Sequence, residues 1–241
     1  MNSEFYADVI EAGGLANALK QMATDLDIPL VLVPGRKEIA DSVGIATTAP
    51  GRQPLTIFLR TDIRGFQVIG RSGEVDIVRG ETDELREIVR AGAAWAAGTP
   101  ASLMRGTQPF LLFDELAEAH ERGPEAAVAA RWDQLREQAV GAPDFGEFGR
   151  LVEVAYEEPR LRQLFPFTSH WTVAFSSCTG RPYRDEIAIA PQPGRPYIVL
   201  QHANVGMIAE VPTVEEAVAL ALAHLPESVG PAVAGFTGRH R

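Results

Sequence analysis

The chain has 241 residues, of which 46% are hydrophobic and 22% charged, the balance of an ordinary globular protein. This length allows one large domain or two small ones. The formal net charge is −10, and the acids are spread over the predicted helices. This argues against a nucleic-acid partner, because phosphate binding needs clustered lysine and arginine.

The first part of the chain, residues 1–98, is predicted to form a helix–sheet–helix unit. Residues 3–26 carry apolar side chains at helical spacing. Period-two alternation, typical of an antiparallel meander with one covered face, then appears in residues 29–34, 43–49, 54–60, 65–71 and 73–78. A helix over residues 83–97 follows. Gly92 lies on its buried stripe, where the missing side chain would let a neighbouring element approach closely.

The second part repeats this order after a helical connector over residues 99–143. A unit over residues 144–235 is expected to begin with a helix. Its strands are predicted at residues 170–177, 186–191, 196–202 and 205–211. Thr213 and Glu216 form a capping box, which predicts the start of a final helix. Residues 236–241 are expected to be a tail, partly disordered.

The two halves resemble each other in the order of their elements. Residues 65–89 and residues 196–220 both read as strand, turn, strand and capped helix. We therefore predict an α+β fold of two helix–antiparallel-meander–helix units, related as an internal pseudo-repeat and joined by the helical connector.

The candidate functional segment is Leu164–Pro182, which contains the only cysteine, a tryptophan, a histidine and a run of hydroxyls. Interpreted as a strand from His170 onward, it places Trp171 in the core with the alternate apolar residues. His170 then lies on the opposite face, beside the hydroxyls. Thr168, Ser169 and His170 are therefore candidate binding residues. The alternative is a strand-end histidine that bonds a backbone carbonyl.

Three residues after the predicted turn at 179–182 are further binding candidates. Arg181, Tyr183 and Asp185 would rim a pocket together with His170. The alternative is that they are loop residues in water.

A Cys–His nucleophile pair is not expected, although His170 and Cys178 are close in sequence. Eight residues of continuous strand cover roughly 26 Å, whereas a nucleophile and its base must come within about 3 Å. Cys178 is therefore interpreted as a structural residue.

Several other classes of site and location are not indicated. There is no phosphate-binding glycine motif and no HExxH, and the five histidines are scattered. We therefore expect no metal site and no cofactor. The N-terminus does not read as a signal peptide, and no apolar run approaches the ~18 residues of a membrane span, so the expected location is the cytoplasm.

Several stretches resemble one protein family. The run RLRQLFPFTSHWTVAFSSCTGRPY and the downstream TVEEAVALALAHLPESVGPAVAG resemble actinobacterial proteins grouped as DUF6193, labelled natural product biosynthesis proteins. ADVIEAGGLANALKQMA, RGETDELREIVRAGAAWAAGTP and LAEAHERGPEAAVAARWDQLRE are similar to that family as well, which extends the resemblance over nearly the whole chain. It implies a setting in secondary metabolism, but no reaction, cofactor or catalytic residue.

Two functions follow as expectations. The first is an accessory or binding protein of bacterial secondary metabolism, which recognises a partner protein, peptide or small molecule between the two halves. The second is a metal-free tailoring enzyme that uses His170 as general acid or base beside Thr168, Ser169 and Asp185. The oligomeric state is left open.

Overall fold

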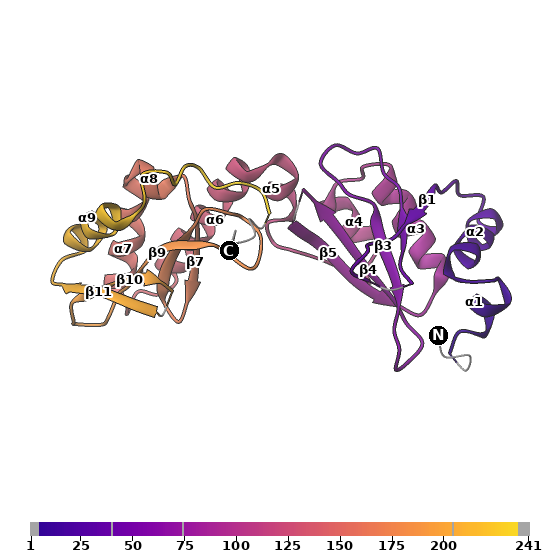
Figure 1. Cartoon of the computed structure of the whole chain (residues 1–241), viewed down its shortest axis with the longest axis horizontal. Helices are drawn as coiled ribbons and strands as arrows, with labels where there is room; N and C mark the ends of the chain where they lie inside the picture. Colours follow the sequence, from indigo (N-terminus) through magenta and orange to yellow (C-terminus); the bar gives the residue numbers. More distant parts are fainter. Residues whose placement is uncertain (1–4, 40, 74, 204, 236–241) are drawn as a thin grey trace. The chain divides into compact units, whose positions relative to one another are not determined.

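The computed structural model describes residues 5–39, 41–73, 75–203 and 205–235. It divides the chain into two compact units, Met1–Glu121 and Arg122–Arg241 (Figure 1). Each unit combines helices with one antiparallel sheet, so the predicted α+β class is confirmed. The boundary between the units falls inside the predicted connector, residues 99–143. The predicted tail, residues 236–241, lies outside the described residues.

The N-terminal unit is a six-stranded antiparallel sheet in which α1 and α2 precede the strands and α3 and α4 lie between β5 and β6. Its strands pair in the order β1-β2-β3-β4-β5-β6. Its elements are α1 (Ala7–Glu11), α2 (Leu15–Asp25), β1 (Leu32–Pro34), β2 (Val43–Ile45), β3 (Leu55–Leu59), β4 (Phe66–Ser72), β5 (Val75–Thr82), α3 (Leu85–Ala96), α4 (Ala101–Thr107), β6 (Leu111–Phe113) and α5 (Ala117–Arg122).

Strand β6 lies within residues 99–143, which the sequence predicts to be helical. Leu111 pairs with Gly80 of β5. A Cβ at Gly80 would lie 2.7 Å from the Leu111 side chain and 2.8 Å from the Phe110 carbonyl oxygen. The glycine therefore provides the space that lets this short strand dock.

Helix α3 packs closely on the covered face of the N-terminal sheet. Its stripe includes Ile88, Val89 and Trp95, each with no exposed surface. A Cβ at Gly92 would lie 2.3 Å from Cδ1 of Ile45 in β2, closer than packed atoms approach. The predicted close approach at Gly92 is confirmed.

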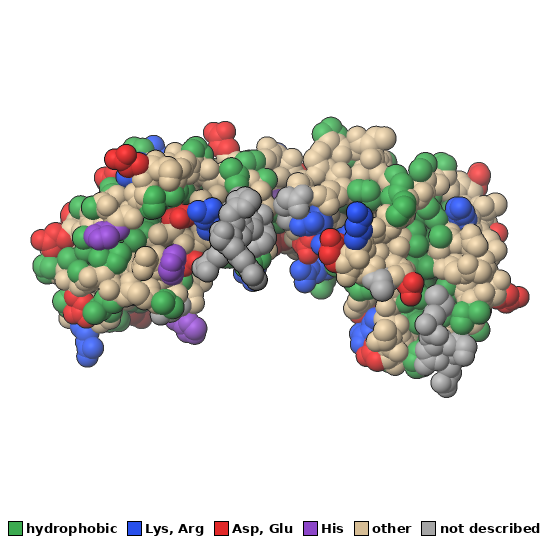
Figure 2. All heavy atoms as spheres, in the orientation of Figure 1, with side chains coloured by type: hydrophobic (Ala, Val, Ile, Leu, Met, Phe, Trp, Pro, Cys, Tyr) green, Lys and Arg blue, Asp and Glu red, His purple; other side chains and the backbone are tan. Residues whose placement is uncertain are grey.

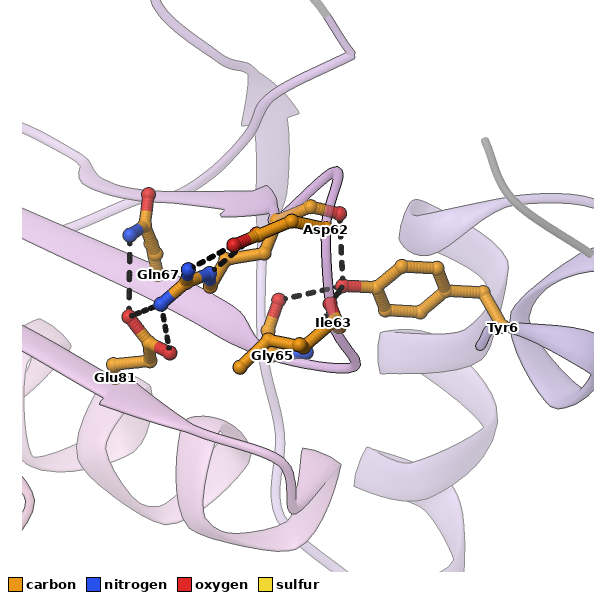
Figure 3. A network of polar contacts seen from close by, with 7 residues as sticks. Tyr6, Asp62, Ile63, Gly65, Gln67 and Glu81 are labelled. Carbon is orange, nitrogen blue, oxygen red and sulfur yellow. Dashed lines mark hydrogen bonds and ion pairs between the residues drawn. The ribbon is translucent and has the colours of Figure 1, made fainter. Parts of the chain in front are cut away.

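Tyr6 connects the first helix to the turn between β3 and β4 (Figure 3). Its hydroxyl accepts a hydrogen bond from the backbone N–H of Gly65 at 2.9 Å. The same oxygen lies 2.8 Å from the Gly65 carbonyl and 3.1 Å from the carbonyls of Arg60 and Ile63. A hydroxyl has one proton to donate, so the three carbonyls share it. The Tyr6 hydroxyl thus binds backbone groups from both ends of the turn and stabilises its conformation.

Ion pairs support the same turn from both sides. The Arg64 guanidinium donates to both carboxylate oxygens of Asp8 in α1, at 2.8 and 2.9 Å, and this bonding lowers the pKa of Asp8. Arg60 donates to Asp62 and Glu81, and its hydrogen bond lowers the pKa of Asp62. Helix α1, the turn and β5 are therefore tied together by side chains far apart in sequence.

The C-terminal unit is a five-stranded meander with strand order β11-β10-β9-β8-β7. Its elements are α6 (Pro124–Val140), α7 (Gly146–Glu157), α8 (Pro159–Arg162), β7 (Phe165–Ser169), β8 (Thr172–Ser176), β9 (Asp185–Ala190), β10 (Tyr197–His202), β11 (Val205–Val211) and α9 (Val214–His224). The predicted capping box is present at the start of α9, where the Thr213 hydroxyl accepts from the Glu216 N–H at 3.2 Å.

One face of this sheet, here called the inner face, carries the core. Its side chains are Val173, Phe175, Ile187, Ile189, Tyr197 and Val199, all at most 2% exposed. Phe175 contacts Trp132 of α6 at a ring distance of 6.0 Å. The Tyr197 hydroxyl donates to the Glu147 carbonyl of α7 at 3.2 Å. Helix α9 packs against β9, β10 and β11, and α7 packs against α9 (Figure 1).

Glu147 also fixes the connection between β9 and β10. One carboxylate oxygen accepts from the Gly194 N–H at 3.0 Å, and this bond lowers the pKa of Glu147. Burial raises the pKa of Tyr197 on the neighbouring strand. Helix α7 thus holds both the strand and the turn that precedes it.

The strand edges of the C-terminal sheet differ. At the β7 edge, the Arg131 Nε of α6 donates to the Pro166 carbonyl at 3.0 Å. At the β11 edge, the register shifts opposite Val199 and Leu200, and Gly206 has a φ of 71°.

Within the described ranges, every helix is too short or too polar to cross a membrane.

In both units a run of consecutive antiparallel strands ends in a hairpin that is followed by a helix, as β4–β5–α3 and β10–β11–α9. The N-terminal unit adds β6 beside β5, whereas β11 stays at the edge of its sheet. The pseudo-repeat remains a prediction.

We expect Tyr6→Phe to lower the free energy of unfolding of the N-terminal unit by about 1–3 kcal/mol, because the buried Gly65 N–H loses its acceptor while the ring is kept. Urea denaturation measures the change. Tyr183→Phe is the matched control, since that hydroxyl makes only an exposed 3.3 Å contact with Arg181. Equal stabilities of Tyr6→Phe and the parent protein would contradict the role of the hydroxyl.

We expect Gly92→Ala to destabilise the same unit by about 1–3 kcal/mol, because the new methyl group overlaps the Ile45 side chain. Gly106→Ala is the control within the unit, since nothing lies within 4 Å of a Cβ built at that helical position. Thermal unfolding of both variants tests the contact. A Gly92→Ala variant as stable as Gly106→Ala would refute it.

Candidate functional site

His170 and Trp171 form the two-residue turn of the β7–β8 hairpin. Their φ values are 49° and 70°, and Ser169 pairs with Thr172 across the turn. The prediction that a strand begins at His170 is therefore wrong, because β7 ends at Ser169 and β8 begins at Thr172. Positive φ at both central residues is the backbone of a type I′ hairpin turn, which matches the strand twist.

Contacts with two phenylalanines offset the strain of a tryptophan at positive φ. The Trp171 ring meets Phe145 and Phe148 edge to face, at centroid distances of 5.6 and 5.1 Å. Phe148 is buried, whereas Trp171 is 43% exposed. Trp171 was predicted to lie in the core beside Val173 on a continuous strand. It instead lies on the hairpin tip, where one side of the ring is packed and the other is open.

The three candidates at this turn point in different directions. Thr168 pairs with Val173 and so lies on the inner face. Ser169 lies on the opposite face, and its hydroxyl is 3.4 Å from Nδ1 of His170. His170 is exposed at the tip. They are neighbours in sequence but do not converge on one point.

Tyr183 belongs to a loop, residues 177–184, that returns over the sheet. Its ring stacks on Phe167 of β7 at 4.5 Å and lies 5.5 Å from Phe165. The Arg181 guanidinium lies 5.4 Å from the Tyr183 ring centre. Arg181 and Tyr183 are therefore brought together, but they lie over Phe167 of β7 and form no pocket with His170.

Asp185 lies at the other end of β8 from His170. It pairs with Ser176, whereas His170 precedes Thr172, and the strand between them spans roughly 13 Å at ~3.3 Å per residue. The predicted grouping of His170 with Asp185 is therefore wrong. Closeness in sequence does not bring the two together, because the strand directions of the meander place them at opposite ends of β8.

His202 is the histidine that lies beside Asp185, and the sequence analysis missed it. Its Nδ1 is 3.0 Å from the Asp185 backbone oxygen and 3.8 Å from the carboxylate. The carboxylate accepts from the Ala203 N–H at 2.6 Å. With the proton on Nδ1, this arrangement leaves Nε2 as the basic nitrogen. The sequence could have indicated this pair, because His202 ends the predicted strand that follows the strand of Asp185.

The face opposite the helices, here called the outer face, is defined by the strand register. One row crosses all five strands, because paired residues share a face: Phe167, Ala174, Ala188, Leu200 and Met207. Ala174 and Ala188 have short side chains, so the centre of the row projects less from the sheet than Phe167 and Met207 at its ends.

Exposed apolar side chains gather at the β11 end of the outer face. Met207 is 64% exposed and Val205 is 63% exposed. Leu200 and Ile198 on the neighbouring strand are half-buried. Figure 2 shows hydrophobic side chains with histidines and acids among them on the surface of this unit. Large exposed apolar side chains in one place are typical of interaction surfaces.

Cys178 is fully buried just beyond β8. Its Sγ accepts from the Arg184 N–H at 3.3 Å and lies 3.5 Å from the Ser176 hydroxyl. A parallel bridge to Val233 brings the C-terminal segment alongside it. These contacts support the structural interpretation, with His170 at the opposite end of β8.

The described residues outside this sheet offer neither a metal site nor a reactive arginine. Their His, Cys, Asp and Glu side chains form no group of three that could hold a metal ion. A recess of about 450 Å³ in the N-terminal unit lies above Arg52. The Arg52 guanidinium donates to Glu121 and Thr99 at 2.6 Å each and stacks on Trp95 at 4.3 Å. These bonds hold the end of α3, so the arginine is a structural residue.

Comparison with known proteins gives one match. The model of a family of unknown function, DUF6193, matches residues 126–236. This range lies inside the C-terminal unit, and the resemblance noted for the rest of the chain remains a prediction. No curated protein and no solved structure matches the chain.

We expect iodoacetamide to alkylate Cys178 slowly in the native protein and rapidly in urea, because the thiol has no exposed surface. Mass spectrometry over time measures both rates. Rapid alkylation of the native protein would overturn the structural interpretation and return Cys178 to the reactive residues.

Proposed function

We propose, on the premise that residues 126–236 belong to the DUF6193 family, that this unit is a binding module. The protein is then a cytoplasmic accessory protein of bacterial natural-product biosynthesis. It recognises a partner protein, peptide or small molecule without metal or nucleotide chemistry. The family resemblance suggests the role in natural-product biosynthesis, and the exposed apolar side chains of the sheet suggest that the role is binding.

The exposed apolar side chains of the outer face support this proposal. Met207 and Val205 are each more than 60% exposed, on a sheet whose inner face carries the buried core. The sheet is rigid and its outer row is fixed by register, so the surface is formed before a partner arrives. Burying Met207 against a partner would remove apolar area from water, which favours association.

The predicted catalytic grouping gives little support to an enzyme. His170 stands on a turn about 13 Å or more from Asp185, beyond the reach of a shared proton. The alternative of a metal-free tailoring enzyme is favoured by one observation only, the 3.0 Å contact of His202 with Asp185. In that alternative His202 replaces His170 as general acid or base.

We expect Met207→Glu to lower the yield of the natural product about tenfold in the bacterium that carries the gene, because a charge is placed on the binding surface. Metabolite profiling measures the yield. Leu112→Glu is the matched control, an equally apolar residue that is 73% exposed in the N-terminal unit. Circular dichroism establishes that each variant is folded.

The same experiment separates the two functions. His170→Ala is expected to leave the yield unchanged. Loss of product in a folded His202→Gln variant, with normal yield in Met207→Glu, would contradict the binding module and favour the enzyme.

A further inference from the structure

The strands of the C-terminal sheet carry an unbalanced charge. Their residues include Asp185, Glu186 and Glu210 but no lysine or arginine. Arg181, Arg184 and Arg195 lie in connections between strands, and Arg131 of α6 binds the Pro166 carbonyl at the β7 edge. The strands themselves therefore present carboxylates and one imidazole, that of His202, to a partner.

Glu210 is the acid whose charge is open to a partner. Glu186 is bound by Arg184 at 2.9 Å, and Asp185 by Ala203 at 2.6 Å. Glu210 is exposed, and no ion pair found among the described residues includes it. It pairs with Ile198 on the outer face, one row from Leu200 and Met207. The β10–β11 side thus offers an apolar surface with an uncompensated negative charge.

The edge of β11 is a poor place to add another strand. The register shift opposite Val199 and Leu200 and the positive φ of Gly206 make its outer backbone irregular. Bulges of this kind protect sheet edges from pairing. A partner is therefore expected to use the side chains of the face.

The negative charge of Glu210 favours some binding partners of this face over others. A second copy packed face to face would bring Glu210 against strands that carry acids and no cation, which disfavours the contact. Nucleic acids and acidic proteins are disfavoured for the same reason. A partner that carries both apolar and cationic side chains satisfies Met207 and Glu210 together.

We infer that the β10–β11 side of the outer face binds a cationic, apolar peptide segment, in which apolar side chains cover Leu200 and Met207 and a lysine or arginine pairs with Glu210. This inference rests on the proposed function and names the class of its partner. The attraction is electrostatic at the rim, so affinity falls as salt concentration rises.

The test uses the full chain and two fluorescein-labelled peptides of equal length, one of alternating leucine and lysine and one of alternating leucine and glutamate. Fluorescence anisotropy measures the two affinities. We expect the lysine peptide to bind at least about tenfold more tightly. Glu210→Lys should weaken the lysine peptide about three- to tenfold, and Met207→Ser should weaken it about tenfold.

Two variants of the N-terminal unit serve as controls. Leu112→Ser removes an apolar side chain and Glu118→Lys reverses an exposed acid, and neither is expected to change binding. The inference is overturned if the glutamate peptide binds as well as the lysine peptide, if Glu210→Lys has no effect, or if neither peptide binds at about millimolar concentration.

The outcomes also distinguish this inference from the proposed function. If Met207→Ser weakens both peptides while Glu210→Lys changes neither, the binding face stands and the cationic partner is wrong. If Met207→Ser changes neither affinity, the face itself is not the binding surface, and the proposed function fails at this site.

Discussion

The backbone hydrogen bonds between β7 and β8 pair Ser169 with Thr172 and Phe167 with Ala174, and the other strands continue this register. Because side chains alternate between faces, a slip of one residue would expose Val173 and bury the outer row. The turn at His170 and Trp171 sets the register, and edge-to-face contacts of Trp171 with two phenylalanines stabilise the turn. The inner core, the outer row and the position of Asp185 all depend on this arrangement.

The class of the fold and several local features could be predicted because they depend on neighbours in sequence. The capping of α9 by Thr213 and the close packing at Gly92 follow from spacing within one helix. The turn at Trp171 could not be predicted, since tryptophan is not a turn residue and its positive φ is stabilised by α7. Strand β6 was missed for the same reason: Gly80, some thirty residues away in sequence, provides its docking site.

The candidate site was predicted as a set of residues but not as a geometry. Tyr183 and Arg181 do meet, and Asp185 does have a histidine partner, yet that partner is His202. Which histidine reaches an aspartate in a meander depends on strand direction and register, and these are set by pairing over the whole sheet. The exposed side chain of Met207 gave no motif at all, because exposure is a property of the folded surface.

Arg131 and Pro166 have a consequence for how the C-terminal unit behaves at high concentration. Pro166 has no N–H to offer, and its carbonyl oxygen is already bonded to the Arg131 side chain at 3.0 Å. Pro166 therefore makes the β7 edge a poorer template for a strand from a neighbouring molecule, which is the first step of edge-to-edge aggregation. Because Arg131 of α6 protects this edge, the side chains of the outer face do not have to be charged to prevent edge-to-edge pairing.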